Sequence, residues 1–156
     1  MRRSRRWSDV LRRVARDEGS ASIEFLTVGL LLLVPTVYLV IALSAIQSAS
    51  FAVEGAARQA SRVFVQAETV AAGEAAAARA IAVTLADYGL SAQQASVQIT
   101  CRPDPADCLA RRGHVTVAIT TVVPLPLFPA VLDADIPLGV ALDAVATEQV
   151  SRFAGS

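Results

Sequence analysis

The longest apolar segment lies near the N-terminus, where no charged residue occurs between Glu24 and Glu54. Its densest part runs from Phe25 to Ile46, and 14 of these 22 residues are Leu, Ile, Val or Phe. As a helix with a rise of ~1.5 Å per residue it would be about 33 Å long, close to the ~30 Å thickness of the bilayer hydrocarbon. The pattern predicts a transmembrane helix over residues 20–46. A buried helix of a soluble domain is the alternative, but such a helix does not need so long an apolar run.

The region after this segment, residues 47–89, is rich in alanine, the best helix former. We expect the membrane helix to continue to about Gln66 and a second helix to run over 69–87, with Gly89 in a left-handed conformation after its end. Apolar residues at spacings of three or four predict the buried face of the first piece. They are Val53, Ala56, Ala60, Val63 and Phe64.

Residues 90–156 show a different pattern, in which apolar and polar positions alternate as in half-buried strands. We expect strands at 96–101 and 114–123 and a third within 136–150. The proline-rich segment 124–129 cannot form a central strand and is predicted to be a loop with an exposed apolar tip. The predicted fold class is α+β: a long N-terminal transmembrane helix continuing outside the membrane, a second helix, and a small antiparallel sheet of about three strands.

Charge is distributed unevenly, although the formal net charge is zero. Residues 1–19 contain seven arginines and three acidic residues, whereas residues 20–156 contain seven arginines and eleven acidic residues. Because positive charge beside a span stays in the cytoplasm, we expect this basic leader inside and the chain beyond about residue 47 outside.

The leader itself also has a helical pattern of apolar residues, at Trp7, Val10, Leu11 and Val14. Arginines on its other faces suit a short helix on the anionic inner leaflet of the membrane. A nucleic-acid-binding arm would also be rich in arginine, but the adjoining span favours lipid, so we expect no nucleic-acid partner.

A cleaved secretory signal is another interpretation of a basic leader followed by an apolar run. Such signals have an apolar region of about 7–15 residues that ends in a small-x-small cleavage site. Here the run is longer, Glu24 interrupts its start, and only the stretch 42–45 weakly matches such a site. We therefore expect the span to be retained.

The junction between leader and span has the sequence GSASIEF, residues 19–25, with a glycine and, five residues later, a glutamate. A basic leader, this Gly and a Glu at the start of an apolar helix resemble type IV prepilins, most closely the TadE-like family of tight-adherence (Tad/Flp) pilus proteins. The resemblance implies cleavage by a prepilin peptidase between Gly19 and Ser20, so that Glu24 becomes the fifth mature residue. Ile23, Glu24 and Phe25 match the hydrophobic-Glu-Phe signature of the family.

This resemblance covers residues 17–65 by motif and the rest by pilin-like architecture, with Pro35 farther from the glutamate than is common in the family. It implies a minor pilin or pseudopilin in a tight-adherence pilus or its assembly machinery. The implied partners are prepilin peptidase, other pilin or pseudopilin subunits, assembly platform proteins and membrane lipid. The implied location is the bacterial cytoplasmic membrane, as a single-pass protein, and the cell surface after processing.

Two alternatives to this function remain. The chain could be an unprocessed, membrane-anchored accessory subunit of a type II/IV-like secretion apparatus, with Glu24 as an unpaired interfacial carboxylate. It could also carry an envelope enzyme or ligand-binding domain. The sequence has a single histidine, His114, and no HExxH, GxSxG or Gly-rich phosphate loop. We therefore expect no enzyme, no cofactor and no metal.

The only two cysteines, Cys101 and Cys108, flank a turn-rich segment between the first two expected strands. Outside the cytoplasm a disulfide between them is the natural interpretation. Two free thiols, or a metal site that includes His114, are the alternatives. His114 itself is expected to be a surface residue at a strand end.

Overall fold

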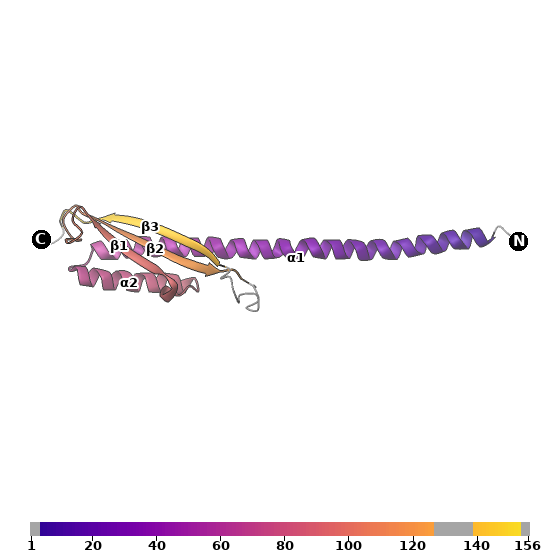
Figure 1. Ribbon diagram of the computed structural model, residues 1–156, viewed down its shortest axis with the longest axis horizontal. Coiled ribbons are helices and arrows are strands. Elements are labelled where there is room, and N and C mark those ends of the chain that lie inside the picture. The colour runs from indigo at the N-terminus through magenta and orange to yellow at the C-terminus, as the bar shows by residue number, and fades with distance from the viewer. Residues whose placement is uncertain (1–3, 127–138, 154–156) are drawn as a thin grey trace. The chain divides into compact units, whose positions relative to one another are not determined.

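The structure, a computed structural model, describes the backbone of residues 4–126 and 139–153, and side chains in these ranges from residue 21 onward. Figure 1 shows the elements in chain order. They are α1 (Ser4–Val65), α2 (Val70–Asp87), the 3₁₀ turn η1 (Ala92–Gln94), β1 (Ser96–Arg102), β2 (His114–Pro124) and β3 (Gly139–Gln149). The predicted α+β layout is confirmed. The chain divides into two units, Met1–Ile41 and Ala42–Ser156, which are described in turn.

The first unit consists of the N-terminal part of α1. Within this helix the segment Ala21–Val65 is long and apolar enough to cross a membrane, judged by length and composition. Pro35 lies inside the helix without ending it. The end of α1 at Val65 agrees with the predicted end near Gln66.

The leader differs from the prediction of a separate short helix. Helix α1 begins at Ser4 and continues through Gly19 and Ser20 without a break. The junction contains no proline, and a single glycine costs a helix only about 1 kcal/mol relative to alanine. The side chains expected on the leaflet, Trp7, Val10, Leu11 and Val14, lie outside the described side chains.

The second unit, which we call the outer unit, has two layers, with the C-terminal part of α1 and helix α2 packed on one face of an antiparallel sheet of order β1-β2-β3 (Figure 1). Helix α1 contributes mostly small residues to the core, and Phe64 is the largest fully buried side chain. The buried residues of α1 include the predicted positions Val53, Ala56, Ala60 and Phe64, whereas Val63 is half-buried.

Helix α2 begins and ends as its sequence predicts. The hydroxyl of Thr69 accepts a hydrogen bond from the amide of Ala72 at 3.2 Å, which caps the N-terminus. Gly89 has φ +71°, the left-handed conformation expected after the last turn. A Cβ at Gly73 would lie 3.2 Å from the carbonyl oxygen of Phe64, so this glycine allows α2 to approach α1 closely.

The strands follow the predicted alternation except at the start of β1, where Val97 is 42% accessible. In β2, Val115, Val117 and Ile119 are fully buried against the helices. Residue Pro124 was expected in the loop but pairs with Gly139 at the end of the ladder. A proline is tolerated there because a terminal position loses only one ladder donor. The rest of the expected apolar tip, 127–129, and the predicted strand start, 136–138, lie outside the described residues.

Candidate functional site

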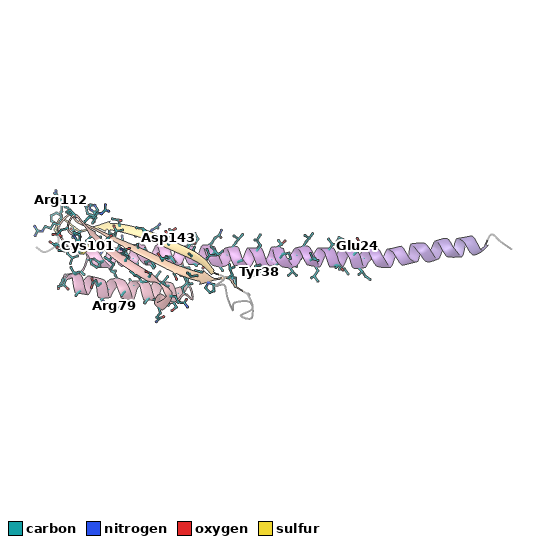
Figure 2. All side chains as sticks on the ribbon, in the orientation of Figure 1. Glu24, Tyr38, Arg79, Cys101, Arg112 and Asp143 are labelled. Carbon is teal, nitrogen blue, oxygen red and sulfur yellow. A yellow bond between two sulfur atoms is a disulfide. The ribbon has the colours of Figure 1, made fainter. Side chains whose placement is uncertain are left out.

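The predicted processing site lies inside α1. The backbone of Gly19 and Ser20 is helical, and Glu24 lies one helical turn further along (Figure 2). The side chain of Glu24 is exposed, as is that of Phe25 with 79% of its surface accessible. Among the described residues Glu24 forms no ion pair. The glutamate therefore presents its carboxylate outward at the beginning of the apolar segment.

The apolar segment that follows is exposed around its whole circumference. The five consecutive residues from Leu30 to Val34 are each 57–69% accessible. Successive residues of a helix are rotated by about 100°, so five of them cover a full turn. A helix that is apolar on every side is stable in a membrane or inside a bundle of other helices. This part of α1 therefore requires lipid or neighbouring helices around it.

Two threonine hydroxyls within the segment are satisfied by the helix itself, whereas the buried hydroxyl of Tyr38 has no hydrogen-bond partner among the described residues. The hydroxyl of Thr27 donates to the carbonyl of Ile23 at 2.7 Å, and that of Thr36 donates to the carbonyl of Leu32 at 2.8 Å. Such bonds are required in hydrocarbon because no water is available to a hydroxyl. The prediction of a membrane span is consistent with this arrangement.

A disulfide joins Cys101 and Cys108, whose Cα atoms are 5.0 Å apart, as predicted from the sequence. Cys101 belongs to the buried core, and Cys108 packs against that core at the end of the loop. Inside the loop the carboxylate of Asp104 accepts a hydrogen bond from the amide of Ala106 at 2.9 Å. The disulfide thus fastens the turn between β1 and β2 to the core.

Replacing both cysteines by alanine is expected to lower the free energy of unfolding of the outer unit by roughly 2.5 kcal/mol, the chain-entropy estimate for an eight-residue loop. The measurement is urea unfolding of the full chain in detergent, monitored by hydrogen exchange of the β2 amides. Reduced wild-type protein is the control and should resemble the variant. Equal stability of oxidised and reduced protein would contradict the prediction.

The end of the sheet beside the disulfide carries three basic side chains that the sequence analysis did not group. Arg102 and His114 are directly opposed across β1 and β2. With Arg112, whose φ is +62°, they line an open cavity of about 770 Å³. His114 is exposed at a strand end, as predicted. The register across the loop was the missing signal, because residues twelve apart in sequence become neighbours only after the strands pair.

Two further cavities among the described residues contain little reactive chemistry. One of about 340 Å³ beside the disulfide is lined by Phe64, Val70, Glu74 and neighbours, and one of about 810 Å³ lies where α1 ends, around Glu68 and Arg111. Within the described ranges no three His, Cys, Asp or Glu side chains are grouped so as to hold a metal ion. The features of this chain that imply a function are therefore the junction of α1 and its apolar surface.

Comparisons with models of protein families, with curated proteins and with solved structures found no match to this chain. Its functional interpretation consequently rests on its own residues and geometry.

Proposed function

We propose that this chain is a minor pilin or pseudopilin-like subunit of a tight-adherence pilus or of its assembly machinery. The observation that carries the proposal is an exposed carboxylate, Glu24, five residues after Gly19 and at the start of a helix that is apolar on every side. A retained membrane anchor needs the apolar helix but has no use for a charged group at that point. In a subunit that moves from lipid into a helical bundle, this carboxylate can neutralise the positive charge of a neighbouring subunit.

The proposed role of Glu24 is to neutralise the N-terminus of a neighbouring subunit. Cleavage after Gly19 gives Ser20 a free ammonium group, and Glu24 follows it by four residues, about 6 Å along the helix axis. When apolar helices pack with a stagger, the carboxylate of one subunit can meet the ammonium of the next. An unpaired charge in such a bundle is strongly unfavourable, so this pairing sets the axial register of the subunits.

A protease binds its substrate in an extended conformation, whereas the backbone of Gly19 and Ser20 is helical in this structure. Processing therefore requires α1 to unwind locally. Glycine weakens a helix by about 1 kcal/mol relative to alanine, so the helix opens most easily at this residue. The proposed partners are accordingly prepilin peptidase, other pilin-like subunits, the assembly platform and membrane lipid.

The proposal is tested by the N-terminal sequence and intact mass of the chain isolated from membranes that contain an active prepilin peptidase. We expect a chain that starts at Ser20, and a Gly19→Leu variant that keeps residues 1–19. The matched control is Gly29→Leu, in the same helix, where an added Cβ meets no atom within 4 Å. This control should be processed normally. A wild-type chain that keeps residues 1–19 while a known prepilin is cut contradicts the proposal.

A second candidate is an unprocessed accessory subunit of a secretion apparatus. The unbroken helix across Gly19 and Ser20 favours it, since helical backbone resists proteolysis. The same mass measurement distinguishes the two candidates. A start beyond Ala42 would instead indicate a secreted protein and contradict both.

A further inference from the structure

The face of the sheet that the helices leave uncovered is almost free of charge. The register places its outward side chains in rows across β1, β2 and β3. The rows contain Ser96, Thr120 and Asp143; Gln98, Ala118 and Val145; Thr100, Thr116 and Thr147; and, at one end, Val122 and Ala141. Asp143 is the only charged residue among them, and the basic side chains Arg102 and His114 are confined to the row at the other end. Val145 is 65% accessible.

The outward face of α2, on the opposite side of the outer unit, also carries few charged side chains. Its buried stripe consists of Gly73, Ala77, Ile81 and Leu85. The side chains opposite this stripe are alanines together with Val83, which is 63% accessible, and Arg79. A surface helix normally carries several charged residues on this face. Here Arg79 is the only charge at its centre, because Glu74 lies at the margin, lining the cavity beside β1, and the exposed Asp87 is the last residue of the helix.

Apart from their ends, the two faces therefore carry single charges of opposite sign among uncharged side chains. Arg79 and Asp143 lie on opposite sides of the outer unit (Figure 2). Neither forms an ion pair within the part of the chain that the structure describes. An α2-to-α2 contact centred on Arg79 would oppose two arginines, and a sheet-to-sheet contact centred on Asp143 would oppose two aspartates. Placing α2 against the sheet brings Arg79 and Asp143, which have unlike charges, together.

We propose that the outer units of successive copies of this chain dock through these surfaces, with the α2 face of one copy on the sheet face of the next. Arg79 of one copy then pairs with Asp143 of its neighbour. Because the two faces belong to opposite layers, every docked copy offers a free face to a further copy, so the contact repeats. The proposal rests on the proposed function, which places the chain among packed subunits, and adds a contact between copies that does not involve the membrane helix.

Cysteine cross-linking in membranes tests this docking mode with the full chain. We would express Ala82→Cys, beside Arg79 on the α2 face, and Val145→Cys, beside Asp143 on the sheet face. The native cysteines are both in the disulfide and do not compete for a short bis-maleimide reagent. We expect each variant alone to remain uncross-linked and co-expression of the two to give a dimer. A chain with both cysteines should give a ladder of oligomers.

Charge reversal tests whether the predicted pair holds this contact. Arg79→Glu or Asp143→Arg alone is expected to lower the cross-linked yield roughly three- to ten-fold, and the two reversals together should restore it. The matched control is Arg58→Glu. Arg58 is also an exposed helical arginine but already pairs with Glu54 of its own helix at 3.0 Å, so its reversal should leave the yield unchanged.

Three results would overturn the docking mode: self-cross-linking by either single-cysteine variant, no dimer on co-expression, or a yield that is insensitive to both reversals. The starting residue of the same chains is determined in parallel, which separates the two proposals. Chains that start at Ser20 without cross-linking overturn the docking mode alone. Cross-linked chains that keep residues 1–19 support docking and contradict the pilin-like function.

Discussion

Glu24→Ala is expected to exclude the processed chain from the assembled fraction, lowering incorporation by at least about 100-fold. The substitution removes the carboxylate that would neutralise a neighbouring N-terminus and leaves an ammonium group unpaired among apolar helices. Removing one partner of a buried charge pair costs about 3–5 kcal/mol, and each 1.4 kcal/mol is a factor of ten in an equilibrium constant. Membrane insertion should persist, because the apolar segment is unchanged.

The measurement compares the amount of chain in sheared surface filaments with the amount left in the membrane. Glu54→Gln is the matched control: it removes another exposed glutamate from α1, and its partner Arg58 remains solvated. An exposed pair of this kind contributes about 0.2–1 kcal/mol, so assembly should change little. Normal incorporation of Glu24→Ala, or an equal loss in both variants, would contradict a specific role for Glu24.

Features with local causes were predicted well from the sequence. Helix α2 was expected over 69–87 and runs over Val70–Asp87, with Gly89 at positive φ after its end as predicted, whereas the capping role of Thr69 was not predicted. The three strands were predicted because alternation fixes which side chains face the helices. The disulfide was predicted because its cysteines flank a short turn and need no distant partner.

Features that depend on pairing between distant residues were not predicted. The opposition of Arg102 and His114, and the extension of β2 to Pro124, follow from a register that only the folded sheet determines. The sequence does not show that Arg79 and Asp143 are isolated charges. Their isolation follows from the uncharged side chains that the fold places around them.

The continuous helix through Gly19 and Ser20 differs from the prediction of a separate leader helix for another reason. A protease binds its substrate in an extended conformation, whereas the isolated chain adopts the conformation that its helix propensity favours. The two are compatible if the peptidase supplies the energy of local unwinding through binding. The cost is small for a site that includes a glycine.

The largest stability effect in the outer unit is expected from Phe64→Ala. Phe64 is fully buried, while the other core positions of α1 are alanines, Val53 and Ser61. Its ring contributes most of the apolar volume at the end of α1 and contacts the place where Gly73 of α2 comes close. Truncating a buried phenylalanine removes its contacts and leaves a cavity, which costs about 3–5 kcal/mol. Since the adjoining alanines are too small to fill this space, we expect a value in the upper half of that range.

The experiment is again urea unfolding of the full chain in detergent, monitored by hydrogen exchange of the amides of β2. Phe51→Ala is the matched control, because Phe51 lies on the same helix but is 68% accessible, so its truncation should change the free energy of unfolding by less than about 0.5 kcal/mol. Phe64→Leu should fall between the two, since it keeps part of the apolar volume. Equal losses for Phe51→Ala and Phe64→Ala would mean that the packing of α1 on the sheet does not depend on this ring. The alanine face of α1 would then have to hold the two layers together by itself.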